Sequence, residues 1–337
     1  MKEKKAENKI DSIDLAKFIF AFSVIYIHAG GGTVTQPILS KVVDAFNSLA
    51  VPFFFITAGY FFFSRLEILD SVDMKKNYAV KYILKTIKIY AIWSIALIPS
   101  RVILSTDSML LFLIKWLRVF LFIGDAQLWY LNALIVGLVL VLFLKKIGLN
   151  DKSIMLASIV LFLLGLCVQK QLDIMEPSAY SGILRIYYLI FGKTVKNGLF
   201  VGMFYCMIGK LISKSQCNMK QENIYVICLF IVYTMSIYKH FQWHSLLLPI
   251  LSLLVFDSIR NTRIKLGEKS KWYRSMSTLM FLSHYIFVQM FVCFPKLTVY
   301  FPAGWHKYFF VVICTLLLSV ALIFWGNKNI KVRKLWQ

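Results

Sequence analysis

The chain has 337 residues, of which 59% are hydrophobic and only 16% are charged. About a quarter of the residues in a soluble domain are charged, so this composition excludes an ordinary soluble protein. The net charge of +22 accompanies a mean hydropathy of +0.70. We therefore assign the positive charge to basic loops flanking a membrane rather than to nucleic-acid binding.

Apolar runs of the length that crosses a hydrocarbon core of ~30 Å follow one another along the chain. We expect an all-α, polytopic integral membrane protein, because only helices and closed barrels satisfy their backbone in lipid. The alternating strands of about ten residues that form barrels do not appear. The runs lie near residues 13–30, 46–64, 80–99, 108–124, 128–145, 153–169, 198–213, 222–239, 244–258, 275–294 and 307–326.

The run at 108–124 is the weakest of these, because Lys115 and Arg118 lie inside it. We expect it to be interfacial or re-entrant, which leaves ten transmembrane helices in one membrane domain over residues 1–337. The basic segments 1–12 and 327–337 and every strongly basic loop then share one side, so both termini are predicted to be cytoplasmic and the membrane the plasma membrane. The basic loop residues are Lys75, Lys76, Lys81, Lys85, Lys88, Lys145, Lys146, Lys214, Lys220, Arg260, Arg263, Lys265, Lys269, Lys271 and Arg274.

The six cysteines form no C-x-x-C pair, and five of them lie in or beside apolar runs. Cysteines of this kind are typical of small buried apolar residues. The chain lacks the ligand spacings of zinc proteins, so we predict no metal site.

The first apolar run ends in S-V-I-Y-I-H-A-G-G-G, which places a histidine inside a predicted span. Lys17 precedes His28 by eleven residues, almost three helical turns, so the two side chains share a face. Asp14 lies one turn before Lys17, close enough to pair with it. Ionisable groups in a span usually face a bundle interior or a water-filled path, and histidine suits proton transfer. The alternatives are a snorkelling Asp14–Lys17 pair at the inner interface and an interfacial His28 bonded to a carbonyl.

The segment I-D-S-I-D-L-A-K-F-I-F-A-F-S-V-I-Y-I-H-A resembles the opening helix of the membrane-bound acyltransferase-3 family. That family has an arginine, ten intervening residues and a histidine there. Within the family, the chain looks most similar to the membrane half of serine racemases of vancomycin-resistant bacteria, without their soluble racemase domain. The resemblance continues in V-P-F-F-F-I-T-A-G-Y-F-F (51–62), Q-L-W-Y-L-N-A-L-I (127–135), V-K-N-G-L-F (195–200) and L-M-F-L-S-H-Y (279–285).

This resemblance implies an O-acetyltransferase that moves an acyl group, commonly acetyl from acetyl-CoA, from the cytoplasm to a hydroxyl at the outer face. The implied partners are acyl-CoA as a substrate, a surface or lipid-linked glycan as acceptor, and the lipid bilayer, with no nucleic acid and no bound cofactor. By position, His28 matches the catalytic histidine of the family and Lys17 its arginine. Lys17, Gln127 (where many members have His) and Thr57 (where many have Ser) depart from the family pattern, and the donor and acceptor class stays open.

Transfer from a thioester to a hydroxyl needs a base, donors for the oxyanion and cations for the CoA phosphates. We expect His28 to be the base, with Asp14 and Lys17 lining the approach of the donor. The cofactor-binding candidates are the four basic residues at the inner ends of the second and third helices. Ordinary positive-inside charge is the alternative for all of them. They are Arg65, Lys81, Lys85 and Lys88.

On the acceptor side, Trp129 and Tyr130 open a predicted helix at the outer face and suit stacking on a sugar. Lys196 and Asn197 precede Gly198 at another helix start, where they suit a polar acceptor or an oxyanion. His284 lies mid-way along the ninth predicted helix as a second candidate for substrate contact. The corresponding alternatives are interface aromatics, a helix cap and a buried structural histidine.

Two other functions fit parts of the pattern. Ten helices and intramembrane charges are compatible with a transporter or flippase of a small polar solute or polysaccharide precursor. Against this, no pair of Gly/Pro-broken helices marks a midplane site. A non-catalytic assembly or sensor protein is the other alternative, favoured by lysine in place of arginine at position 17.

Overall fold

The computed structural model describes residues 10–30, 36–214, 222–239 and 244–337. All the secondary structure among these described residues is helical, as the sequence predicted. The chain divides into two compact units. Unit 1 comprises Met1–Thr57, Leu97–Leu104 and Ser215–Gln337, and unit 2 comprises Ala58–Ala96 and Ser105–Lys214. The helix α3 (Ala50–Glu67) contributes to both units.

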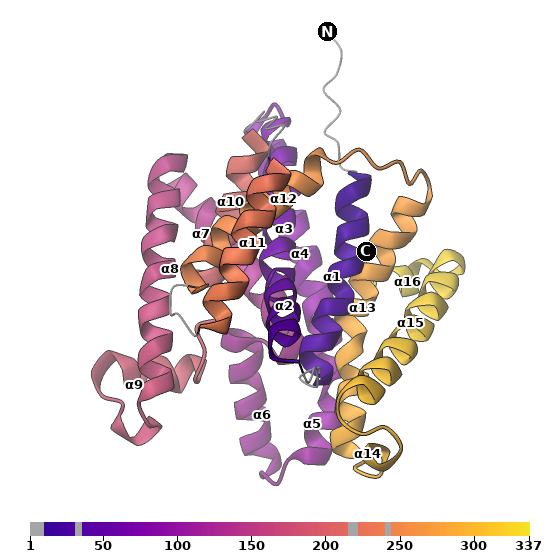
Figure 1. Cartoon of the computed structure of the whole chain (residues 1–337). Coiled ribbons are helices and arrows are strands. Elements are labelled where there is room, and N and C mark those ends of the chain that lie inside the picture. Colours follow the sequence, from indigo (N-terminus) through magenta and orange to yellow (C-terminus); the bar gives the residue numbers. More distant parts are fainter. Residues whose placement is uncertain (1–9, 31–35, 215–221, 240–243) are drawn as a thin grey trace. The chain divides into compact units, whose positions relative to one another are not determined.

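Unit 1 is built around the parallel neighbours α1 and α13, which lie side by side in Figure 1. The buried side chains Ala21 and Ile25 of α1 and Met276 and Met280 of α13 belong to one apolar core, which α15 also contacts. The helices of unit 1 besides α3 are α1 (Asp11–Ala29), α2 (Pro37–Ser48), α5 (Ile98–Leu104), α11 (Glu222–Tyr238), α12 (His244–Asn261), α13 (Lys269–Cys293), α14 (Leu297–Tyr300), α15 (Trp305–Lys328) and α16 (Ile330–Arg333).

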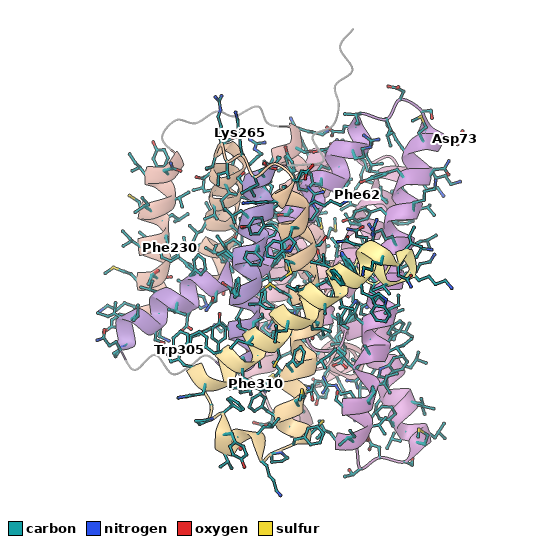
Figure 2. The ribbon with its side chains drawn as sticks, turned by 90° about the vertical axis from the view of Figure 1, so that its right-hand side faces the viewer. Phe62, Asp73, Phe230, Lys265, Trp305 and Phe310 are labelled. Atoms are coloured by element: carbon teal, nitrogen blue, oxygen red, sulfur yellow. The ribbon has the colours of Figure 1, made fainter. Side chains whose placement is uncertain are left out.

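The helix α15 presents one apolar face away from its neighbours. Trp305 and Phe310, in its first two turns, are labelled in Figure 2. Phe310 packs inward on the Phe291 and Phe301 rings, with centroids at 5.4 and 4.6 Å. The opposite face exposes large apolar side chains at helical spacing, a pattern that a bilayer rather than water accommodates. Its exposed residues are Phe309, Ile313, Leu317, Val320 and Phe324.

Unit 2 is centred on the close packing of α7 against the π-helix η4. The side chain of Asn197 caps η4, because its Oδ1 accepts hydrogen bonds from the backbone N–H groups of Leu199 and Phe200. The helices of unit 2 besides α3 are α4 (Val72–Ala96), α6 (Met109–Arg118), η1 (Val119–Ile123), η2 (Ala126–Leu128), α7 (Trp129–Lys146), α8 (Asp151–Ile174), η3 (Pro177–Ala179), α9 (Gly182–Phe191), η4 (Gly198–Gly202) and α10 (Met203–Lys214).

Glycine makes this packing possible. A Cβ built on Gly202 would lie 2.2 Å from the carbonyl oxygen of Ala133, and one on Gly137 would lie 2.6 Å from the backbone of Gly202 and Met203. The opposing atoms are backbone, so they move only if the two helices separate. Small residues serve this purpose at helix contacts in membranes.

We therefore expect Gly202→Ala to destabilise unit 2 by about 1–3 kcal/mol, the usual cost of forcing extra atoms into a packed core. The matched control is Leu199→Ala, in the same π-helix but at an exposed position. Thermal unfolding of the purified protein in detergent measures both. Equal unfolding midpoints for the two variants would contradict the close approach of α7 and η4.

Seven stretches of the described residues are long and apolar enough to span a membrane. Three predicted crossings fall outside this set, on α10, α11 and α12, so the count of ten and the cytoplasmic placement of the termini stay predictions. The seven stretches are Asp11–Ala29, Pro37–Glu67, Val72–Leu104, Met109–Lys146, Asp151–Ile174, Lys269–Cys293 and Trp305–Lys328.

The predicted interfacial run 108–124 folds as α6 and η1, neither of which has a buried residue. Gly124, with φ of +83°, ends η1 before η2 and α7. Two side chains hold carbonyls of the π-helix: Tyr90 Oη donates to Phe120 O at 2.5 Å, and Asn132 Nδ2 donates to both Phe120 O and Leu121 O at 3.2 Å. This polar anchoring suits a segment whose helical ladder is interrupted.

The cysteines differ from the prediction in their burial. Among the described residues they are free thiols, but only Cys206 is buried, while Cys167 and Cys228 are exposed on apolar helices. A helix surrounded by lipid exposes small apolar residues without cost, which explains the difference. Two predicted positions, Cys217 and the loop residue Lys220, lie outside the described residues.

Candidate functional site

The predicted base His28 lies in the last turn of α1. The helix ends directly after it, because Gly30 adopts the left-handed conformation (φ +86°) and its N–H donates to Tyr26 O. The His28 ring lies beside two side chains of α13: its centroid is 5.3 Å from that of His284 and 5.5 Å from that of Tyr285. The structure thus brings together two histidines that the sequence placed in separate roles.

His284 is fully buried, and its hydrogen bonding fixes its tautomer. Its Nδ1 lies 3.0 Å from the carbonyl oxygen of Met280. A carbonyl only accepts hydrogen bonds, so Nδ1 carries the proton and Nε2 of the neutral ring is an acceptor. This Nε2 has no hydrogen-bond partner among the described residues. Buried polar atoms are normally satisfied, so an unsatisfied one beside His28 marks a position for a donor.

The neighbouring Tyr285 connects this histidine pair to a cation. Its ring has the guanidinium of Arg101, on α5, at 5.9 Å from the centroid. Sequence reasoning missed Arg101, which lies two residues after the end of the apolar run 80–99. An arginine at the end of a membrane span is the available signal. The cluster of His28, His284, Tyr285 and Arg101 thus combines proton-accepting nitrogens with a permanent positive charge.

Asp14 has partners beyond the Lys17 that the sequence predicted. Its buried carboxylate is bound by Arg274, whose Nη2 lies 2.7 Å from Oδ2 and whose Nε lies 3.0 Å from Oδ1, and by Ser270 Oγ at 2.7 Å. Lys17, the predicted partner, lies one turn further along α1, is partly buried, and interacts electrostatically with Asp14. Arg274 holds the carboxylate in a bidentate contact, because a guanidinium matches a carboxylate with two parallel hydrogen bonds.

Asp11, one turn before Asp14, is a second carboxylate that connects α1 to the start of α13. Its Oδ2 accepts hydrogen bonds from the backbone N–H groups of Leu266 (2.6 Å) and Gly267 (3.3 Å), just before α13. The start of α1 is thus fixed to the start of α13 by two carboxylates. These contacts give Asp14 an anchoring function that the sequence did not predict.

Two of the four predicted acceptor residues of unit 2 lie in contact with each other. The ammonium of Lys196 lies 5.8 Å from the centroid of the Trp129 ring, a cation–π arrangement. Tyr130 is buried in α7. Asn197 caps η4, the structural role that was its alternative, and its Nδ2 donates to Tyr187 Oη at 3.0 Å. Lys196 and Trp129 are therefore the predicted acceptor residues that the structure brings into contact.

The predicted phosphate-binding residues come from two helices. Lys81, Lys85 and Lys88 share an exposed face of α4, as their spacing predicted, and Arg65 is partly buried in the last turn of α3. Of the two other departures from the family pattern, Gln127 is buried, and the buried Thr57 hydroxyl has no hydrogen-bond partner among the described residues.

The helical fold and its long apolar helices define a membrane protein. A family model described as an acyltransferase domain matches residues 10–324. The chain therefore belongs to this acyltransferase family, as the resemblance in its motifs indicated. No solved structure matches it.

The curated relatives carry racemase names. The chain is 26% identical to an amino-acid racemase of Enterococcus faecalis over 94% of its own length and 46% of the relative's. It is 29% identical to another amino-acid racemase of the same organism over 78% of its length and 38% of the relative's. A serine/alanine racemase of Enterococcus gallinarum is 26% identical over 49% of this chain and 24% of the relative. The chain thus spans less than half the length of these relatives.

Proposed function

We propose that the protein is a multi-pass enzyme of the plasma membrane that transfers an acyl group, acetyl by default, from cytoplasmic acyl-CoA to a hydroxyl of a cell-envelope glycan. The observation that carries this proposal is the His28–His284 pair in a chain of the acyltransferase family. The racemase names of the relatives give no activity here, because the matched part is under half of those proteins.

The chemistry assigns one role to each histidine. His284 offers Nε2 as a hydrogen-bond acceptor at the site, and an unprotonated nitrogen of the His28 ring is the base. That nitrogen takes the proton of the acceptor hydroxyl while its oxygen attacks the thioester carbonyl carbon. The tetrahedral intermediate collapses with cleavage of the C–S bond, and the CoA thiolate takes the proton back from His28. General base catalysis of this kind contributes ~10²–10⁴-fold.

The positive groups of the site have complementary roles. We assign the stabilisation of the oxyanion that forms during the attack to Arg101, whose guanidinium lies beside Tyr285. Lys17 occupies the family's arginine position on the same face of α1 as His28. Lys196 and Trp129 belong to unit 2 and are a separate candidate for sugar contact, because they offer an ammonium and an aromatic face.

Radiolabelled acetyl-CoA given to inside-out membrane vesicles with native acceptor material tests the proposal. Base-labile label in the acceptor, dependent on the protein, is the expected result, because an O-acyl ester is cleaved by base. Vesicles that contain the protein but form no labelled acceptor would contradict the proposal. Substrate counterflow in the same vesicles would then test the transporter alternative.

Lys17→Arg should retain transfer activity within about threefold, because it keeps the charge at the position where the family has arginine. Lys17→Met should lose about tenfold or more, the effect of removing one charge-assisted hydrogen bond. The control is Ile19→Met, at an exposed position on the same helix. An inactive Lys17→Arg enzyme would show that the lysine has a function that the family arginine lacks.

A further inference from the structure

A basic pocket lies at one end of unit 2, and its lining includes none of the residues that the sequence suggested for phosphate binding, although Arg65 directly precedes Leu66, which lines it. Its volume is about 260 Å³. It lies where α3, α7 and α10 end and where α4 and α8 begin. The side chains of Phe63, Leu66 and Leu142 form its apolar part.

Three ammonium groups meet one carboxylate in this pocket. Lys145 and Lys210 each place Nζ 2.6 Å from Oδ1 of Asp151, and Lys214 places Nζ 2.6 Å from Oδ2. Asp151 holds this position because Asn150 caps the start of α8, its side chain accepting from Ser153 N at 2.9 Å. A single carboxylate thus orients three lysines from two other helices toward one point.

The pocket retains a positive excess. Glu67 lies 3.2 Å from Lys214, and Lys75 is a fourth cation of the lining, so four ammonium groups face two carboxylates. Hydrogen bonding to Asp151 raises the pKa of Lys214, so this lysine is charged at neutral pH. Neighbouring ammonium groups repel one another, and an anion placed among them relieves that repulsion.

Lys210 distinguishes this pocket from ordinary surface charge. Only 5% of the residue is exposed, and its ammonium lies 4.9 Å from the centroid of the Phe63 ring. Its contact with Asp151 uses one of the three donors of an ammonium group. A buried cation that shares its counter-ion with two other lysines has donor capacity left for a ligand.

We propose that this pocket binds phosphate groups, those of the acyl-CoA donor, while the apolar side chains contact the part of the ligand that continues from them. Lysine binds phosphate as a point charge, and several lysines around one pocket match a group that carries two negative charges. The identity of the ligand rests on the proposed function, whereas the phosphate chemistry rests on the pocket. The headgroup of an anionic phospholipid offers the same chemistry from the bilayer.

The test measures binding, so it does not depend on transfer. The full chain is placed in nanodiscs of neutral phosphatidylcholine and titrated with CoA. Lys145→Gln and Lys214→Gln are the variants, because both lysines are more than 40% exposed in their side chains and tolerate replacement better than the buried Lys210. Lys146→Gln is the matched control, an exposed neighbour that does not line the pocket. Unfolding midpoints confirm that each variant is folded.

We expect the affinity for CoA to fall about tenfold or more in both variants and to stay unchanged in Lys146→Gln, which would support the pocket. CoA that binds all four proteins equally would overturn the pocket and leave the proposed function standing. Absence of CoA binding throughout, with phosphatidylglycerol binding that depends on Lys145 and Lys214, would support the phosphate site and count against the proposed function. If neither ligand responds to the two variants, the pocket is not a phosphate site.

Discussion

His28→Ala should abolish the appearance of base-labile label in the acceptor, a loss of ~10²–10⁴-fold, while the protein remains inserted and folded. The ring lies against His284 and Tyr285 in the last turn of α1, where alanine continues the helix without strain. Label transfer in inside-out vesicles, normalised to the amount of inserted protein, is the measurement.

Ile27, which precedes His28 in the chain, provides the control for the His28→Ala experiment. Ile27 is 50% exposed, so Ile27→Ala changes a side chain on a different face of the same turn. It should leave transfer unchanged. Full activity in His28→Ala would refute the general-base mechanism. Equal losses in the two variants would show that the end of α1, rather than the imidazole, is sensitive to substitution.

Arg274→Ala should destabilise the protein by about 3 kcal/mol, the low end of the range for breaking a buried ion pair. The substitution removes the bidentate partner of the buried Asp14 carboxylate, which keeps the hydrogen bond from Ser270 and the nearby charge of Lys17. Asp14→Asn should cost less, about 1 kcal/mol. The reason is that the Arg274 side chain is 41% exposed and can be hydrated, whereas Asp14 is 3% exposed and cannot.

Comparing the loss of stability in Arg274→Ala with that in Asp14→Asn tests whether the buried carboxylate needs the guanidinium more than the guanidinium needs the carboxylate. Thermal unfolding midpoints of the detergent-purified variants measure it, and Lys271→Ala, at an exposed position one turn before Arg274, is the control. A larger loss in Asp14→Asn than in Arg274→Ala would contradict the burial difference. Midpoints that match the control in both variants would show that the pair does not fix α1 to α13.

The features of the fold that depend on helical spacing within one segment could be predicted from the sequence. The positions of the long apolar helices and the shared face of Lys17 and His28 follow from periods of 3.6 residues within one segment. The partners of Asp14 could not be predicted in this way, because Arg274 is 260 residues away. Arg101, beside Tyr285, was missed for the same reason. Local pattern identifies which side chains need a partner, but tertiary packing decides which residue supplies it.

The positions of the lysines in unit 2 could also be predicted only in part. Lys81, Lys85 and Lys88 share a face as predicted, but that face is exposed. The lysines that converge are Lys145, Lys210 and Lys214, which sit at the ends of two helices and are oriented by Asp151. Spacing along one helix indicates a shared face but not what the face meets. A single acidic residue at a helix start among basic helix ends was the signal available for this cluster.

The two contacts between α1 and α13 also constrain how the chain passes through a bilayer. Asp14 meets Arg274 near the first residues of both helices, and His28 meets His284 further along both. Two neighbouring helices that run in the same direction must enter the membrane from the same side. The number of crossings from α1 up to the one before α13 is therefore even.

This parity bears on the helices between α8 and α13. Five of the seven long apolar stretches precede α13, and five single crossings would make α13 antiparallel to α1. If each of the five stretches crosses once, we expect an odd number of further crossings between Ile174 and Lys269. One crossing each by α10, α11 and α12 meets that requirement, so a contact between two histidines informs the sidedness of helices far from either of them.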